Sequence, residues 1–304
     1  RYGCRTKGEQ TFKGTWLMKV RYAGIVLRPN SPEVEEKGRE LSHWLNQRGI
    51  STAELNQIDH GMDLLIVLGG DGTLLHVADT ASNYGIPVVG VNMGSLGFLS
   101  EIPSEEIYQA LAMVFEGESR IEKRIMLKAY TINGDTGEIS EPVRALNEVV
   151  IVKDSTAAMI RLRCWGNEEY ITTYRADGLI IATPTGSTAY NLSAGGPVVH
   201  AELDSIVLTP ICPFMLDSRP VLLSADTQIT AHLLAPAGEV KVLVDGEVSW
   251  KISESEYLFV HKAERPFLVV SSPWKSYFNI LRTKLNWGGD SVDLPLPEKV
   301  CKHC

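Results

Sequence analysis

The chain has 304 residues, which at roughly 150 residues per domain predicts about two domains. Hydrophobic residues make up 44% and charged residues 22%, a composition typical of a folded globular protein and not of a disordered or fibrous one. The net charge of −8 argues against broad electrostatic binding to nucleic acid or an anionic membrane, although it allows a local basic pocket for phosphate. No apolar run reaches the roughly 18 residues of a membrane-spanning helix. Five scattered cysteines favour a reducing cytoplasm over a disulfide framework.

The first 17 residues do not resemble a signal peptide, because they lack an apolar core and a small-residue cleavage site. We expect residues 1–17 to be a leader outside the fold. From residue 18 to residue 120, strand-like apolar runs alternate with segments whose apolar residues have helical spacing. The predicted strands are 22–27, 63–68 and 86–91, and the predicted helices are 32–48, 73–82 and 105–115. This alternation predicts an α/β domain with a parallel sheet.

The second half of the chain has a different pattern. From residue 121 to about residue 267, β-branched runs are separated by turn signals such as Asn133-Gly134 and Asp245-Gly246, and helical spacing is weak. We therefore expect a β-rich domain over 121–273. A single amphipathic helix is predicted within 274–286, and residues 287–304 have the composition of a loop-like tail.

The clearest candidate site is the pentapeptide Gly69-Gly70-Asp71-Gly72-Thr73, which follows a predicted buried strand and precedes a predicted helix. Ligands of open parallel sheets bind at the carboxyl ends of the strands, and glycines let a phosphate approach the backbone N–H groups. A phosphate would repel the Asp71 carboxylate unless this group holds a metal or accepts a proton, as carboxylates do in phosphoryl transfer. The alternative is a tight turn with a left-handed aspartate, and the strand–loop–helix context favours the ligand site.

Two further motifs are ambiguous by themselves. The segment 90–99 follows the next strand, so Asn92 and Ser95 could donate to sugar or phosphate and Phe98 could contact a base; a glycine-rich connector explains it equally well. Asn147-Glu148 interrupts an apolar run, where a buried carboxylate needs a partner. A salt bridge at a strand edge is at least as good an explanation of this pair as a ligand site.

The longest motif, residues 174–197, joins a buried strand to a dense cluster of hydroxyls and glycines. Such a loop offers many neutral donors to a polyhydroxyl ligand that bears phosphate, and Tyr190 can stack on a base. Other polar residues carry less information. His76 is better explained as an ordinary helix residue, and Cys301–Cys304 lacks a second ligand pair, so an exposed tail is favoured over a metal site.

Together these motifs resemble those of the NAD kinase family over nearly all of residues 18–285. The GGDGT loop also occurs in lipid kinases and 6-phosphofructokinases, whereas DGLIIATPTGSTAYNLSAGGP is long and specific. The resemblance implies phosphoryl transfer from ATP, or from polyphosphate, to the adenosine-ribose 2′-hydroxyl of NAD, giving NADP. It also implies a Rossmann-like N-terminal domain, a β-rich, sandwich-like C-terminal domain whose last helix returns to the first domain, and a homodimer or homotetramer.

The resemblance further implies the roles of individual residues. Asp71 matches the proposed catalytic aspartate, which would orient or deprotonate the 2′-hydroxyl while Mg²⁺ and loop N–H groups hold the donor phosphates. The expected donor loop comprises Gly69, Gly70, Gly72 and Thr73. The expected NAD-contacting residues are Asp71, Gly72, Phe98, Asn147, Glu148, Arg175, Asp177, Thr188, Ala189, Tyr190, Asn191, Leu192, Ser193 and Glu247. The expected partners are NAD and ATP, with neither nucleic acid nor a membrane.

Two departures from the family pattern concern the β-rich half. Many members have Pro-His where this chain has Pro213-Phe214, and Asp-Gly-Gln where it has Asp245-Gly246-Glu247. The latter change adds a carboxylate near the expected site. Two rival functions stay open: a lipid kinase with the same glycine loop, which would need an apolar groove, and a catalytically silent NAD(H)-binding sensor, which would have no need of Asp71. The sequence does not distinguish ATP from polyphosphate, or NAD from NADH.

Overall fold

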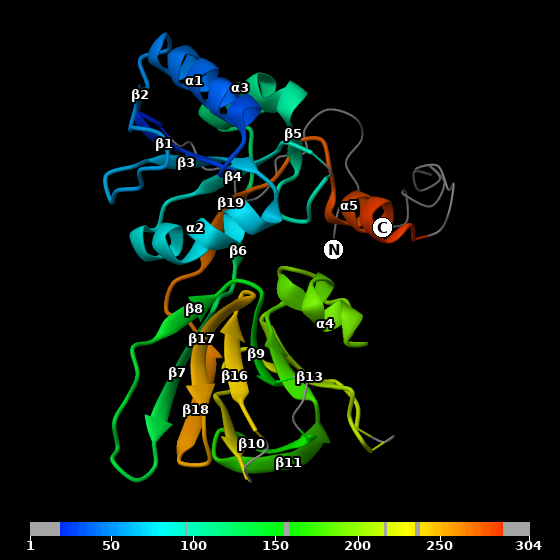
Figure 1. Ribbon diagram of the computed structural model, residues 1–304. Coiled ribbons are helices and arrows are strands. Elements are labelled where there is room, and N and C mark those ends of the chain that lie inside the picture. The colour runs from blue at the N-terminus through cyan, green and yellow to red at the C-terminus, as the bar shows by residue number, and fades with distance from the viewer. Residues whose placement is uncertain (1–18, 95, 155–157, 216–217, 235–237, 288–304) are drawn as a thin grey trace, which may run out of the picture.

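The computed structural model describes residues 19–94, 96–154, 158–215, 218–234 and 238–287. This part of the chain forms an α/β half and a β-rich half, which the chain connects twice, through residues 124–127 and 262–267 (Figure 1). The expected leader 1–17, all of the expected tail 287–304 except Trp287, and Ser95 lie outside the described residues. Within those ranges, no helix has the length and apolar character needed to cross a membrane.

The α/β half is built on a seven-stranded sheet of order β2-β1-β3-β4-β19-β6, with β5 also paired to β4. Neighbours from β2 to β19 are parallel, and only β6 runs antiparallel to its neighbour among the described strands of this sheet. The strands are β1 (Tyr22–Leu27), β2 (Ser51–Thr52), β3 (Leu64–Gly69), β4 (Val88–Asn92), β5 (Ile102–Pro103), β6 (Ile121–Arg124) and β19 (Phe267–Val270).

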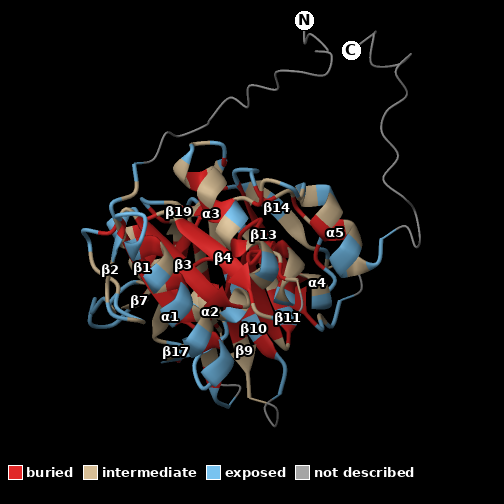
Figure 2. Ribbon diagram, turned by 90° about the horizontal axis from the view of Figure 1, so that it is seen from above, coloured by how far each residue is buried: buried red, intermediate tan, exposed pale blue. Residues whose placement is uncertain are grey.

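Helices cover both faces of this sheet because successive residues of a strand point to opposite sides. Ile66 and Leu68 of β3 share a core cluster with α1 (Pro32–Asn46) and α3 (Ile107–Phe115), whereas Leu65 and Val67 share one with α2 (Asp71–Tyr84). Figure 2 shows β3 and β4 as buried strands between these layers. A strand buried on both faces is continuously apolar, as the sequence of β3 is.

The β-rich half contains two six-stranded antiparallel sheets with the orders β11-β10-β15-β18-β7-β8 and β14-β13-β12-β9-β16-β17. A shared cluster of buried residues from both sheets, including Leu162, Ile181 and Leu258, forms the core of a sandwich. The first sheet consists of β7 (Leu127–Asn133), β8 (Val143–Ala145), β10 (Ile160–Gly166), β11 (Glu169–Ala176), β15 (Ile229–Leu233) and β18 (Glu256–Lys262). The second consists of β9 (Glu148–Lys153), β12 (Gly178–Ala182), β13 (Ser205–Ile211), β14 (Val221–Ser224), β16 (Val240–Val244) and β17 (Glu247–Ile252).

The predicted fold class is confirmed, with differences at the boundaries. The expected limits at residues 120 and 273 cut across the first sheet, because β6 and β19 complete it from within the segment expected to be β-rich. Local patterning cannot reveal this, since β19 pairs with β4 from far away in the sequence. Helix α2 begins at Asp71 instead of residue 73, and the last helix, α5, spans Tyr277–Leu285. Residues 104–106 form a 3₁₀ turn before α3.

Candidate active site

The Asp71 carboxylate joins the two loops that follow β3 and β4. Its Oδ2 accepts a hydrogen bond from the backbone N–H of Phe98 at 2.7 Å. Its Oδ1 accepts three, from the N–H of Leu99 at 3.1 Å and from the N–H and hydroxyl of Ser100, both at 2.9 Å. A Cβ on Gly97 would overlap Oδ1, so this turn needs a glycine. The loops therefore lie together at the carboxyl edge of the sheet, as their positions in the sequence predict.

These contacts decide which oxygen of Asp71 can do chemistry. A carboxylate oxygen has two lone pairs. Because Oδ1 already accepts three hydrogen bonds and Oδ2 accepts one, Oδ2 is the atom that can receive a further donor, such as a substrate hydroxyl.

The predicted donor loop lies at the start of a long helix. Gly70 is the residue before α2, whose 14 residues begin at Asp71, and the Thr73 side chain covers Gly69. The first-turn N–H groups of such a helix and its dipole form a site that suits a phosphate. Gly70 and Gly72 have no atom within 4 Å of the position that a Cβ would occupy, so a ligand can reach the backbone there.

The Asn147-Glu148 pair is positioned by Asp245. The Asp245 carboxylate accepts hydrogen bonds from the backbone N–H groups of Leu146 at 2.7 Å, Asn147 at 2.8 Å and Glu148 at 3.1 Å. Its own N–H donates to the Glu148 carbonyl at 3.0 Å, and its backbone is left-handed, with φ of 48°. Burial raises the pKa of Asp245, and these three N–H donors oppose that rise. Glu247, two residues further on, is exposed at the start of β17.

Glu148 is a buried carboxyl group with unused hydrogen-bonding capacity. Only 7% of the residue is exposed, and its Oε2 has no partner among the described residues. Burial, and to a smaller extent the nearby Asp245, raise the pKa of Glu148 to about 8. A buried polar atom without a partner costs free energy, and a ligand that donates to it would recover that cost.

The long hydroxyl-rich motif packs directly against Asn147. Thr183 donates its N–H to the Asn147 carbonyl at 2.8 Å and its hydroxyl to the Leu146 carbonyl at 2.6 Å. Gly186 approaches Asn147 so closely that a Cβ would overlap the Asn147 carbonyl. Gly186 starts a 3₁₀ turn that ends at Thr188, and α4 (Tyr190–Ser193) follows after Ala189.

The residues of this turn and of α4 differ in their access to a ligand. Tyr190 is 41% exposed, Ser193 is exposed, and Thr188, Ala189 and Leu192 are half-buried. Asn191, by contrast, is fully buried. Its Nδ2 donates to the carbonyls of Ser187 and Pro197, and its Oδ1 accepts the Thr209 hydroxyl at 2.6 Å. The side chain of Asn191 therefore holds the loop together and is not presented to a ligand.

Several contacts bring these pieces from the two halves into one place. Leu146, next to Asn147, shares a core cluster with Leu74 of α2 and with Leu99 of the turn that binds Asp71. Helix α5 lies alongside: the Lys284 ammonium is 5.9 Å from the centre of the Phe98 ring, and the Tyr277 hydroxyl donates to the Val199 carbonyl. Helix α5 thus contacts the Phe98 loop, and Figure 1 shows α5 beside both α4 and the α/β half.

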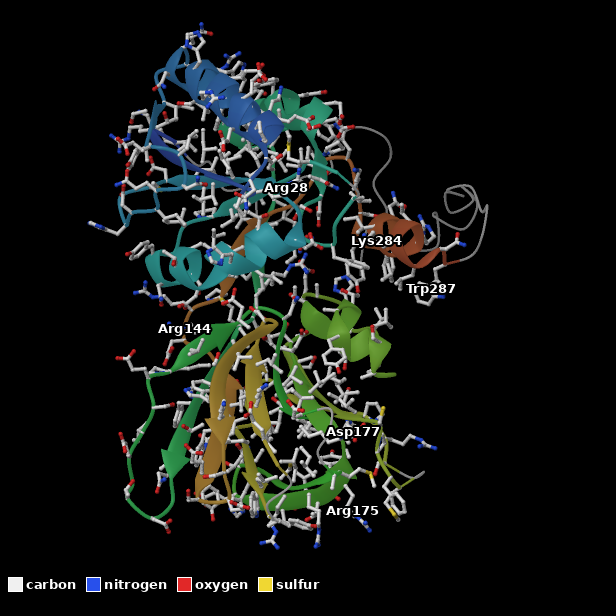
Figure 3. All side chains as sticks on the ribbon, in the orientation of Figure 1. Arg28, Arg144, Arg175, Asp177, Lys284 and Trp287 are labelled. Carbon is white, nitrogen blue, oxygen red and sulfur yellow. The ribbon has the colours of Figure 1, made fainter. Side chains whose placement is uncertain are left out.

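Arg175 and Asp177 do not join this cluster within one chain. They precede β12, whose opposite end leads into Thr183, and a strand rises about 3.4 Å per residue. Figure 3 shows Arg175 at the far end of the β-rich half and Asp177 nearer its middle, both away from Lys284 and Arg144. Asp177 forms an ion pair with Lys153 at 3.6 Å, and the Arg175 guanidinium lies over the Phe214 ring at 4.8 Å.

The site offers little for a resident metal ion. No group of three or more His, Cys, Asp or Glu side chains gathers within the described ranges. Mg²⁺, however, usually keeps several waters and binds through one or two carboxylates together with substrate phosphates. The described residues therefore form no protein cage, and a metal ion would arrive with the phosphate donor.

The sequence did not single out three residues that build the site. In the sequence Asp245 is only part of a turn signal and of the Asp245-Gly246-Glu247 departure, Ser100 follows the glycine-rich segment, and the buried Thr185 hydroxyl has no partner among the described residues. The Asp245-Gly246 turn was the available signal for the first of these. A carboxylate that accepts hydrogen bonds from three distant backbone N–H groups produces no periodic pattern in the sequence.

An open, mostly parallel sheet with a glycine loop and an aspartate at its carboxyl edge is typical of proteins that bind phosphate-bearing ligands. Comparison with known proteins narrows this class. Residues 50–119 match the model of the ATP-NAD kinase N-terminal domain, and residues 146–272 match that of the C-terminal domain. An NAD kinase from Geotalea daltonii is 40% identical over 279 residues, covering 87% of this chain and 98% of the relative. One from Heliobacterium modesticaldum is 39% identical over 280 residues, with the same coverage. The chain belongs to the NAD kinase family.

Solved structures show the same fold. An NAD kinase from Archaeoglobus fulgidus in complex with ATP superposes with a TM-score of 0.71 at 25% identity, over 87% of this chain and 98% of that one. The yeast NADH kinase complexed with NADH superposes with a TM-score of 0.82 at 23% identity, over 92% and 91% of the two chains.

Proposed function

We propose that this protein is an NAD kinase that transfers the terminal phosphoryl group of ATP to the adenosine-ribose 2′-hydroxyl of NAD. The observation that carries this proposal is the position of Asp71. Its Oδ2 can accept a hydroxyl beside the glycine loop, and Leu146, next to Asn147, packs with Leu74 of the helix that Asp71 begins. Family membership weakens the lipid kinase alternative.

In the proposed reaction the ribose 2′-oxygen attacks the γ-phosphorus, the bond from this phosphorus to the β–γ bridging oxygen breaks, and ADP leaves. The proton of the 2′-hydroxyl passes to Asp71 Oδ2. The loop N–H groups around Gly70 and Gly72 bind the donor phosphates, and a Mg²⁺ ion that arrives with them would neutralise their charge. Positioning and charge stabilisation supply most of the rate in such transfers.

The β-rich half would bind NAD. Glu148 and Asn147 offer a carboxyl group and an amide to the ribose or the base edge, and the exposed Tyr190 ring offers a stacking surface. Phe98 would contact the adenine from the opposite loop. Thr188, Ala189, Leu192, Ser193 and Glu247 are proposed as further NAD contacts.

A donor panel tests the proposal. The purified protein is incubated with NAD or NADH and with ATP or inorganic polyphosphate, each with and without Mg²⁺, and NADP(H) is measured by an enzymatic cycling assay. We expect NADP from NAD and ATP in the presence of Mg²⁺, and none without it. Binding of NAD with no turnover under any donor would instead identify a sensor, and phosphorylation of diacylglycerol would identify a lipid kinase.

We further propose that the protein is a cytoplasmic homo-oligomer. The separation of Arg175 and Asp177 from Asp71 supports this, because these two residues could serve NAD only at a site that they complete in another copy. Phe214 and Leu222 are exposed apolar side chains in the same half. Light scattering after gel filtration gives the mass, and a monomer at micromolar concentration would contradict the oligomer.

A further inference from the structure

Arg28 lies beside the glycine loop, although it belongs to no motif. It follows β1, whose Leu27 pairs with Leu68 of β3, and its N–H donates to the Leu68 carbonyl at 2.8 Å. Because paired strands lie about 4.8 Å apart, the backbone of Arg28 is adjacent to Gly69. Figure 3 shows Arg28 above the end of α2 that begins with Asp71.

The guanidinium of Arg28 is available to an anion. Its residue is exposed and takes part in none of the ion pairs of the described residues. Toward the described part of the chain, its side chain makes one hydrogen bond, which Nη2 donates to the Ser31 hydroxyl at 3.2 Å. Ser31 precedes α1 but makes no capping hydrogen bond with its side chain, so it can hold the guanidinium in place.

The charges around Arg28 favour an anionic ligand. The N-termini of α1 and α2 flank Arg28 at the same edge of the sheet, and both favour anions. Glu33 and Glu35 in the first turn of α1 oppose this, but Glu35 faces Arg39 at 4.0 Å. A guanidinium binds phosphate oxygens in a bidentate manner, so the arrangement suits a chain of phosphates that extends from the glycine loop.

The strand order indicates which substrate carries these phosphates. Apart from Asp71 and Gly72 at the start of α2, where the two substrates meet, the residues proposed to bind NAD come from the β-rich half and from the Phe98 loop after β4. Arg28 follows β1, on the other side of β3 from β4. We therefore propose that Arg28 binds the phosphates of the phosphoryl donor and not those of NAD. This inference rests on the proposed kinase function.

The test compares Arg28→Ala and Arg28→Lys with Arg21→Ala, which removes an exposed arginine from the opposite end of β1. Steady-state kinetics give KM for ATP and for NAD separately. Calorimetry gives the affinities for ATP and for inorganic tripolyphosphate in the absence of NAD. Thermal unfolding checks that each variant is folded.

Loss of a charge-assisted hydrogen bond should raise KM for ATP about tenfold in Arg28→Ala, with kcat and KM for NAD within about twofold of wild type. Arg28→Lys should recover part of the loss, and Arg21→Ala should behave as wild type. Tripolyphosphate should lose affinity in parallel with ATP, because the phosphates are recognised. An unchanged KM for ATP, or a rise in KM for NAD instead, would overturn the assignment. If the wild type phosphorylates no acceptor, the proposed function fails, and the calorimetric comparison of ATP affinities alone decides the role of Arg28.

Discussion

Asp71 and Glu148 are both carboxyl groups at the junction of the two halves, yet their surroundings differ. Asp71 is half-buried and accepts four hydrogen bonds from one turn. Glu148 is buried, and its Oε2 has no partner among the described residues. The comparison separates two ways of preparing a group for function. Asp71 is fixed by the protein before a ligand arrives, whereas Glu148 carries a cost that a ligand can relieve.

The largest expected effect follows from Asp71→Asn. Turnover should fall by about two to four orders of magnitude, because the 2′-hydroxyl loses its proton acceptor. The amide also brings an N–H₂ group against at least one donor from the turn at 98–100, so this turn should loosen. We expect the free energy of unfolding to decrease by about 1–3 kcal/mol, measured by urea denaturation.

The matched control for this variant is Asp226→Asn, which makes the same change at an exposed aspartate in a loop of the β-rich half. It should alter neither turnover nor stability. A near wild-type kcat in Asp71→Asn at saturating ATP and Mg²⁺ would show that Asp71 only holds the turn.

Glu148→Gln tests the buried, unpartnered carboxyl group through the pH dependence of the free energy of unfolding. Burial and Asp245 raise the pKa of Glu148 from 4.5 to about 8, so between these values the unfolded chain releases a proton that the folded chain keeps. Rising pH therefore lowers the free energy of unfolding by about 1.4 kcal/mol per unit, or about 3–5 kcal/mol over the window. Glu148→Gln lacks this pH-dependent contribution to the free energy of unfolding. It should match wild type near the lower end of the window and exceed it in stability above the upper end.

Glu101 supplies a control for that experiment. Burial raises its pKa to about 7, and its Oε2 accepts the N–H of Ser272 at 2.9 Å. Glu101→Gln should therefore flatten the pH dependence only below about pH 7, and the remaining slope up to about pH 8 belongs to Glu148. Equal pH profiles for wild type and Glu148→Gln would contradict the assignment.

Asp245→Asn should have a smaller effect. It should change both the backbone position of residues 146–148 and the pKa of Glu148. The amide offers one acceptor atom to the three N–H groups of residues 146–148, so the Asn147-Glu148 turn should shift and KM for NAD should rise about tenfold. Removing the Asp245 charge should also lower the pKa of Glu148 and shorten the pH window of the preceding prediction. Asp226→Asn again serves as control. An unchanged window would mean that burial alone sets the pKa of Glu148.

The sequence predicted the fold where each element has a local signature. The apolar run of β3 and the helical spacing of α1 gave elements close to those observed. It could not predict that β19 joins the first sheet, because a four-residue strand carries no mark of a distant partner. The same limit explains why the expected boundaries at residues 120 and 273 miss the division between the sheets.

For the site, the resemblance to a family identified the motifs but not the geometry within them. Asn191 belongs to the most specific motif, yet its amide is used entirely inside the protein. Asp245 lies outside the motifs chosen as sites, yet it positions Glu148. Which side chains face inward depends on close packing of distant segments, and a single sequence does not encode that packing in its periodicity.

The smallest predicted effect concerns the contact between the two halves. Arg144 of β8 forms an ion pair with Asp79 of α2 at 3.1 Å, with 21% and 50% of the side chains exposed. Exposed pairs contribute about 0–1 kcal/mol, so Arg144→Ala should change the free energy of unfolding by less than about 1 kcal/mol. Because α2 begins with Asp71 and β8 precedes Glu148, loss of this ion pair should make the position of the Asp71 carboxylate relative to Glu148 less fixed. We expect KM for NAD to rise about twofold at low salt and to match wild type in about 1 M NaCl, where exposed charges are screened.

Lys251→Ala is the control. It removes an ion pair with Glu239, at 3.1 Å, that lies wholly within the β-rich half, and it should leave KM for NAD unchanged. A rise in KM that persists at high salt, or that also occurs in Lys251→Ala, would show that the ion pair does not couple the two regions.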